Sequence, residues 1–91
     1  MLMDNQAVQI PYPQNFDIKI VVVSAIPMEE TRRNISQIFS QCKVVHSFVD
    51  VHSSAKGSYY SYCYNIDIES QEHLRHTYDQ LNNLPGIRFV L

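Results

Sequence analysis

Hydrophobic residues recur along the chain with two different periods, which together predict six elements of secondary structure. Every second position is apolar or aromatic in segments typical of strands, which cover residues 16–23, 44–51 and 59–68, with a short apolar segment at 87–91. Spacings of three and four positions, typical of one face of a helix, run from Met28 to Cys42 and from Leu74 to Leu81. The predicted order of elements is therefore βαββαβ.

Capping and turn residues mark the boundaries between these elements. Ser24 and Ser70 precede the two helical stretches and are candidate caps for their free amide groups. Pro85-Gly86 ends the second helix, and Gly57 can adopt a positive φ in the turn between the second and third strands. Periodicity and turn chemistry therefore agree on where the elements begin and end.

This order predicts a ferredoxin-like sandwich, an α+β fold in which a four-stranded antiparallel sheet carries both helices on one face. The strand–helix–strand crossovers prefer right-handed connections, and a hairpin joins the second and third strands. The first and third strands then lie at the centre of the sheet. Residues 16–91 are predicted to form this single domain, and residues 1–15 a polar N-terminal arm.

The third strand alternates most clearly. Tyr60, Tyr62 and Tyr64 are in phase with Ile66 and Ile68, so they are predicted to face the helices. An RNA-binding domain of the same βαββαβ order stacks bases on aromatic residues of its open sheet face. RNA binding is therefore the less favoured alternative.

The predicted topology leaves the other face of the sheet without a helix. Simple alternation places on this open face Lys19, Val21, Val23, Val44, His46, Phe48, Tyr59, Ser61, Cys63, Arg88 and Val90. A mixed apolar patch on a small domain often marks a contact surface. The candidate interface residues are Val21, Val23, Phe48, Tyr59 and Val90. The alternative is a partly solvated sheet with scattered apolar residues.

Composition and charge narrow the class of protein. The 91 residues are 45% hydrophobic and 18% charged, which fits one folded domain with a modest core. The seven basic residues are scattered and the net charge is −2, which argues against binding to nucleic acid or a membrane surface. Cys42 and Cys63 are lone thiols, and the longest uncharged apolar run, residues 20–28, is too short to span a bilayer. We expect a cytoplasmic protein.

The sequence contains no complete set of catalytic or metal-binding residues. His73 and His76 have a helical spacing that can reach one ion, but no third ligand is evident, and the alternative is a solvated helix edge. Asp50 and His52 pair an acid with a base on one strand face, without a nucleophile or an oxyanion-binding feature. We therefore predict no enzymatic activity, no catalytic residues, no metal and no cofactor.

The turn between the second and third strands is a candidate anion site. The ammonium group of Lys56 and the backbone amides around Gly57 can bind an anion. The alternative is a solvated lysine beside a glycine that the turn requires. The turn is not a phosphate-binding loop, because it joins two strands and lacks both the glycine spacing and the following helix.

Three segments resemble a known family. Residues 10–13 (IPYP) resemble a hydrophobic-Pro-x-Pro approach to the first strand, and residues 54–61 (SAKGSYYS) resemble a Ser-x-Lys-Gly-x-Tyr-x-Ser signature. Residues 86–91 (GIRFVL) resemble a terminal apolar-Arg-apolar-Val-Leu strand. From about Ile10 to Leu91 the chain resembles the YbeD family, small bacterial proteins with an ACT-like ferredoxin fold.

The resemblance implies a fold and a regulatory role rather than a reaction, and related ACT domains sense amino acids or similar metabolites, often at a dimer interface. The first hypothesis is a non-catalytic ACT-like regulatory module that forms a homo-oligomer or docks on a partner protein. The second is a sensor of an amino acid or an anionic metabolite. Its candidate ligand-binding residues are Ser24, Ala25, Ile26, Ser54, Lys56, Gly57 and Tyr59.

Overall fold

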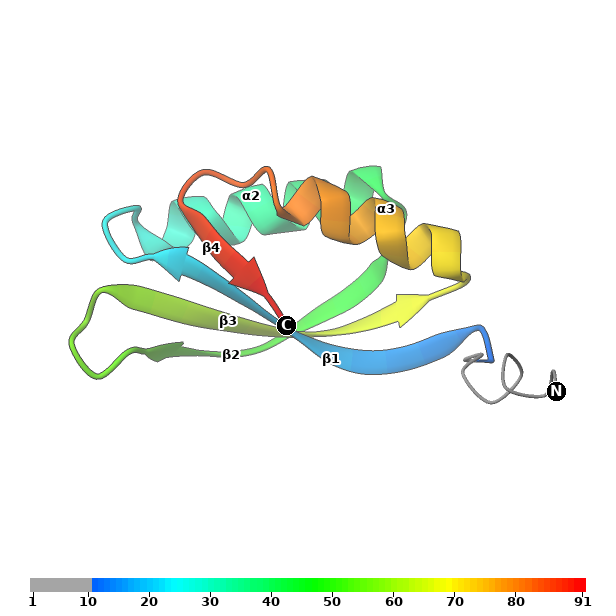
Figure 1. Cartoon of the computed structure of the whole chain (residues 1–91), viewed down its shortest axis with the longest axis horizontal. Coiled ribbons are helices and arrows are strands. Elements are labelled where there is room, and N and C mark those ends of the chain that lie inside the picture. The colour runs from blue at the N-terminus through cyan, green and yellow to red at the C-terminus, as the bar shows by residue number, and fades with distance from the viewer. Residues whose placement is uncertain (1–10) are drawn as a thin grey trace, which may run out of the picture.

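The structure is a computed structural model that describes residues 11–91, and these residues have the predicted order of elements (Figure 1). The elements are β1 (Gln14–Val23), α2 (Met28–Gln41), β2 (Val45–Ser53), β3 (Tyr59–Ile68), α3 (Gln71–Leu81) and β4 (Ile87–Val90). β1 begins before the predicted Phe16, so Gln14 and Asn15 of the predicted arm belong to the sheet. Residues 1–10 of that arm lie outside the described residues.

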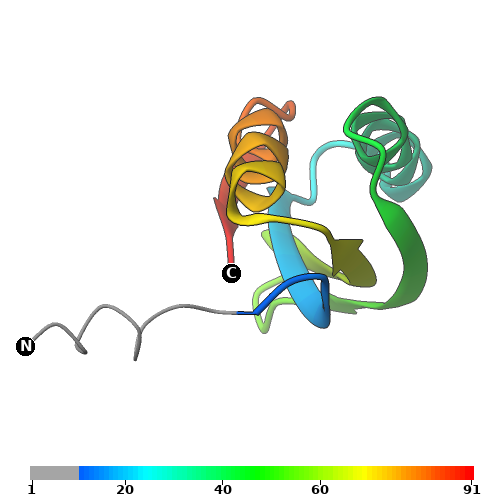
Figure 2. The ribbon, with the colours of Figure 1, turned by 90° about the vertical axis from the view of Figure 1, so that its right-hand side faces the viewer.

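The strands form one antiparallel sheet in the order β2-β3-β1-β4. β1 and β3 are central, as predicted, and pair along their whole lengths from Gln14 opposite Ile68 to Val23 opposite Tyr59. Both helices cover the same face, and no helix of residues 11–91 covers the other (Figures 1 and 2). The structure therefore confirms the predicted ferredoxin-like sandwich.

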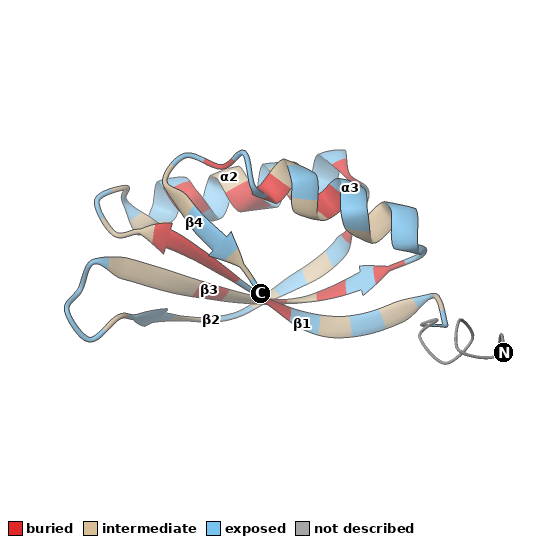
Figure 3. Ribbon diagram, viewed as in Figure 1, coloured by how far each residue is buried: buried red, intermediate tan, exposed pale blue. Residues whose placement is uncertain are grey.

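The core lies between the helices and the inner face of the sheet (Figure 3). Its largest fully buried side chains are Tyr62, Tyr64, Phe39, Ile18, Ile20 and Ile35. Tyr62 and Tyr64 face the helices, as the alternation of the third strand predicts, and Tyr60 packs against the edge of the same core. The aromatic series of β3 is therefore not displayed on the open face.

His73 joins the ends of the two helices. Its Nδ1 accepts a hydrogen bond from the Glu69 amide at 3.0 Å, so Nε2 carries the proton and donates to the Cys42 carbonyl at 2.8 Å. With both ring nitrogens engaged, the side chain has no lone pair to offer a metal. His73 therefore serves the helix junction, whereas His76 is exposed.

At the start of β2, the side chains that face the helices are those that strict alternation assigns to the open face. The His46 ring lies 4.8 Å from that of Phe39, and Arg32 of α2 lies 3.7 Å above the Phe48 ring. Val44 is buried. The prediction that Val44, His46 and Phe48 lie on the open face is therefore wrong, and Phe48 loses its place in the candidate interface.

The physical reason is a β-bulge between Phe48 and Asp50, where an extra residue shifts the alternation by one position. Val51, beyond the bulge, packs against the core just as Phe48 does before it. Val45 and Val49 are left on the open face, 69% and 51% exposed. The same shift separates His46 and His52, which the regular strand places on one face.

A second irregularity lies in the pairing of β1 with β4. Val90 lies opposite Ile20 and packs against the core, whereas Phe89 lies opposite Val21 on the open face. The prediction that Val90 belongs to the open face is therefore wrong. Phe89 takes its place there.

Candidate binding face of the sheet

The open face of the sheet divides into two halves along the strands. The half that holds the start of β1 and the end of β3 carries a network of side-chain hydrogen bonds. Asn65 donates to the carboxylate of Asp17 at 2.9 Å, and Asn15 donates to that of Asp67 at 2.6 Å. The donors and acceptors of these side chains pair with one another, so a partner would gain few new hydrogen bonds on this half.

The other half is a shallow groove between the β2–β3 hairpin and β4, with a volume of about 450 Å³. It is lined by Lys19, Val21, Ser54, Tyr59, Ser61, Arg88, Phe89 and Leu91. Val21 is only 6% exposed, whereas Phe89 and Leu91 keep 49% and 65% of their surface in solvent. The groove therefore has a covered apolar floor and exposed apolar walls.

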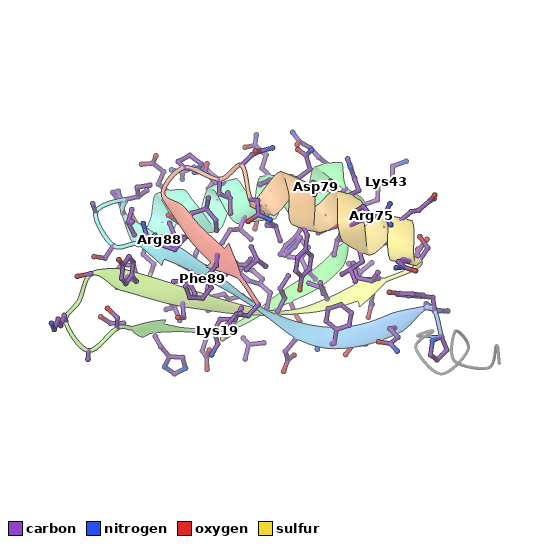
Figure 4. The ribbon with its side chains drawn as sticks, viewed as in Figure 1. Lys19, Lys43, Arg75, Asp79, Arg88 and Phe89 are labelled. Carbon is purple, nitrogen blue, oxygen red and sulfur yellow. The ribbon has the colours of Figure 1, made fainter. Side chains whose placement is uncertain are left out.

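Two basic side chains flank the groove, Arg88 from β4 and Lys19 from the neighbouring β1 (Figure 4). The guanidinium carbon of Arg88 lies 5.3 Å from the centre of the Tyr59 ring, a cation–π distance. No acidic residue lines the groove, and neither basic residue forms a salt bridge with any of residues 11–91. The side chains that line the groove therefore carry a net positive charge, on a chain whose net charge is −2.

The candidate ligand-binding residues meet at the end of the sheet beside the groove, where most bond to one another. The Ser24 hydroxyl donates to the Gly57 carbonyl, and its amide donates to the Ser58 carbonyl at 2.9 Å. Within the hairpin, the Ser54 amide donates to the Tyr59 carbonyl at 2.9 Å, and the Tyr59 amide donates to the Ser54 hydroxyl at 3.1 Å. These bonds tie the β1–α2 turn to the hairpin.

The structure divides the candidate ligand-binding set. Ser54 and Tyr59 line the groove. Ala25 and Lys56 are exposed outside it, and Ile26 packs partly against the core. The groove is therefore lined by residues at the ends of the hairpin turn and not by Lys56 and Gly57 at its tip.

Asp50, His52 and Cys63 form a small cluster next to the groove on the open face. The Nε2 atom of His52 lies 3.2 Å from the Asp50 carboxylate. Burial raises the pKa of the Cys63 thiol, and the neighbouring Asp50 carboxylate raises it further. The thiol is therefore protonated at neutral pH, where it is a poor nucleophile.

Replacing Asp50 by asparagine is expected to lower the pKa of Cys63, because the neutral amide no longer opposes the thiolate. At a given pH below that pKa, iodoacetamide should then alkylate Cys63 faster than in the wild-type chain. The rate is measured against pH by mass spectrometry, and Cys42, whose pKa burial raises, is the internal control. An unchanged or higher pKa of Cys63 would contradict this electrostatic coupling.

Residues 11–91 contain no group of three or more His, Cys, Asp or Glu side chains placed to hold a metal ion. Neither α2 nor α3 has the length and apolar character needed to cross a membrane. The groove is the candidate site that combines an apolar lining with fixed charge.

Phe89 and Leu91 are the groove residues that the sequence did not reveal. β4 has only four residues, too few for its own period to fix which face each residue takes. The available signal was an aromatic residue next to an arginine, because both types are enriched at contact surfaces.

By sequence, this chain is similar to a protein family and to a curated bacterial protein. The family described as "Protein of unknown function (DUF493)" matches residues 8–91. A UPF0250 protein of Shewanella oneidensis is 42% identical over 41 residues, which make up 45% of this chain and 47% of that protein. The chain thus spans about half the length of the curated relative that it matches.

Two solved structures share the fold. The solution structure of a protein from H. pylori has a TM-score of 0.71 and 13% identity, covering 100% of this chain and 94% of that one. The ACT domain of the GTP pyrophosphokinase of Chlorobium tepidum has a TM-score of 0.60 and 18% identity, covering 88% and 97%. At these identities the likeness shows the fold, which is ACT-like. Because the family match extends from residue 8 to the last residue, the chain belongs to the DUF493 family of proteins of unknown function, the YbeD family that its signature predicts.

Proposed function

We propose that the protein is a non-catalytic, ACT-like regulatory module that acts by contact through the groove half of its open sheet face. One observation carries the proposal: the exposed large hydrophobic residues among residues 11–91, Val45, Val49, Phe89 and Leu91, all lie on the open face, and two of them, Phe89 and Leu91, line the groove. Small soluble domains rarely group exposed apolar side chains unless the surface meets another molecule.

The proposed partner is a second copy of the chain. The open face carries both signs of charge, with Lys19 and Arg88 at the groove and Asp50 next to it. When two copies pack around a two-fold axis, the same surface meets itself, so opposite charges on it can pair. Association also buries apolar area for a domain whose own core is small.

The fold supports a regulatory role. The similar ACT domain of Chlorobium tepidum is part of a GTP pyrophosphokinase, so that domain serves within an enzyme. Docking on a partner protein is the alternative form of the same proposal.

Replacing Phe89 by serine is expected to weaken self-association about tenfold or more, because a central aromatic side chain of an interface carries much of its binding energy. Phe89 is 49% exposed in the single chain, so the partner has surface to cover. Sedimentation velocity over a dilution series from millimolar to micromolar protein measures the dissociation constant of both chains.

Val45→Ser is the matched control. Val45 is 69% exposed on the same face but lies in the polar half, opposite Asp67. Its replacement should leave the dissociation constant unchanged, and circular dichroism checks that both variants stay folded. A wild-type chain that remains monomeric at millimolar concentration would refute self-association, and equal effects of the two substitutions would refute the groove as the contact.

A further inference from the structure

We infer that the groove is also a binding site for a small amphipathic anion, meaning a carboxylate or similar group on an apolar or aromatic body. The inference goes beyond the proposed function, because such a molecule needs only one copy of the chain. It rests on the size of the groove, the chemistry of its lining and its unbalanced charge.

The size and lining of the groove suit a small molecule. A volume of about 450 Å³ lies within the range of small-ligand sites, which are lined mostly by apolar and aromatic side chains. Val21 provides the floor, and Tyr59 and Phe89 provide two aromatic surfaces on either side of it. An apolar ring or short chain in this space would cover side chains that water covers now.

The charge of the groove selects an anion. Lys19 and Arg88 line it, no acidic side chain lines it with them, and neither forms a salt bridge with residues 11–91. The Arg88 guanidinium is already held near the Tyr59 ring, which limits the side-chain freedom that binding has to remove. A carboxylate placed here would meet a planar donor suited to bidentate hydrogen bonds.

Neither part of the ligand is sufficient alone. Exposed ion pairs contribute little in water because solvent screens them, so a bare anion should bind weakly. An uncharged ring would leave both basic groups unpaired and gain only part of the contact. The two features together specify an amphipathic molecule.

Hydroxyl groups add donors at the edge of the groove. The Ser54 oxygen accepts the Tyr59 amide, and its own hydrogen has no acceptor among residues 11–91. Ser61 lines the groove beside Val21, its partner across the β1–β3 pair. Both hydroxyls can orient the charged end of a ligand.

The test is a titration of the isotope-labelled chain, at a concentration where it is monomeric, followed by two-dimensional NMR. The probes are phenylpropionate, its neutral analogue phenylpropionamide, and inorganic phosphate. We expect phenylpropionate to shift the amide signals of Val21, Tyr59 and Phe89, and to bind at least about tenfold more tightly than the other two probes. Equal binding of the amide or of phosphate would overturn the inference, as would the absence of binding.

A pair of arginine variants locates the site. Arg88→Gln should weaken phenylpropionate binding about tenfold, whereas Arg75→Gln, at an exposed position of α3, should not change it (Figure 4). Equal losses from the two substitutions would mean a nonspecific charge effect and would overturn the site. The self-association test uses no ligand, so a failed titration leaves the Phe89→Ser result standing, and the reverse also holds.

Discussion

Replacing Gly86 by alanine is expected to lower the free energy of unfolding by about 2–4 kcal/mol. Gly86 has a φ of +71°, a conformation that costs any residue with a Cβ atom. The added Cβ would also lie 2.6 Å from Cδ1 of Ile26 and 2.6 Å from Cγ2 of Val23. The branched Val23 side chain has few rotamers into which it can retreat, so the backbone before β4 has to move.

Gly57→Ala is the matched control for this prediction. Gly57 has a similar φ of +75°, but no atom lies within 4 Å of the position that its Cβ would take. Only the cost of a positive φ applies here, so the free energy of unfolding is expected to fall by about 1 kcal/mol. Urea unfolding followed by circular dichroism compares the two variants, and equal losses would show that the close packing around Gly86 has no energetic weight.

The position of Gly86 connects stability to the groove. It directly precedes β4, whose residues Arg88 and Phe89 form one wall of the groove. The Gly86 carbonyl also accepts a hydrogen bond from the Val23 amide at 3.0 Å. A backbone shift there would therefore move the proposed contact residues as well as weaken the fold.

Replacing Phe39 by alanine is expected to lower the free energy of unfolding by about 3–5 kcal/mol, the range for deleting a buried aromatic side chain. Phe39 is fully buried on α2, with its ring 5.3 Å from that of Tyr64 and 4.8 Å from that of His46. The cavity left behind would separate the helix from β2 and β3. A chain of this size has about 5–14 kcal/mol of stability in all, so the variant would be close to unfolding at room temperature.

Phe39→Leu serves as the graded control, because it keeps most of the buried volume. Phe39→Leu should lower the free energy of unfolding clearly less than Phe39→Ala does, and urea unfolding measures both values. Equal losses in the two variants would mean that the buried volume of the side chain at position 39 is not what holds α2 to the sheet.

The order of elements and the inner face of the sheet could be predicted from the sequence, because each rests on a long periodic segment. β3 is the clearest case, since its ten residues alternate without interruption and Tyr62 and Tyr64 face the core as predicted. The start of α3 also follows local chemistry, because the Ser70 hydroxyl accepts a hydrogen bond from the His73 amide at 3.0 Å. The prediction that Ser24 caps the first helix is wrong, since its hydroxyl donates to the Gly57 carbonyl and α2 begins after Pro27 without a side-chain cap.

The outer face could be predicted only in part, because both edge strands are irregular. The bulge in β2 and the shifted pairing of β4 reverse the faces of Phe48 and Val90, which strict alternation assigns to the open side. A bulge depends on contacts with the neighbouring strand, so no period within β2 or β4 reveals it. Val21 and Tyr59 lie on the open face as predicted, because they belong to the central strands, which pair regularly with each other.

The central claim is that the protein acts through the groove half of its open face, and a dilution series of backbone amide NMR spectra tests it most directly. We expect signals of Val21, Tyr59 and Phe89 to shift as the concentration rises, while signals from the outer surfaces of α2 and α3 stay in place. Spectra that do not change with concentration, or shifts confined to the helices, would contradict the claim.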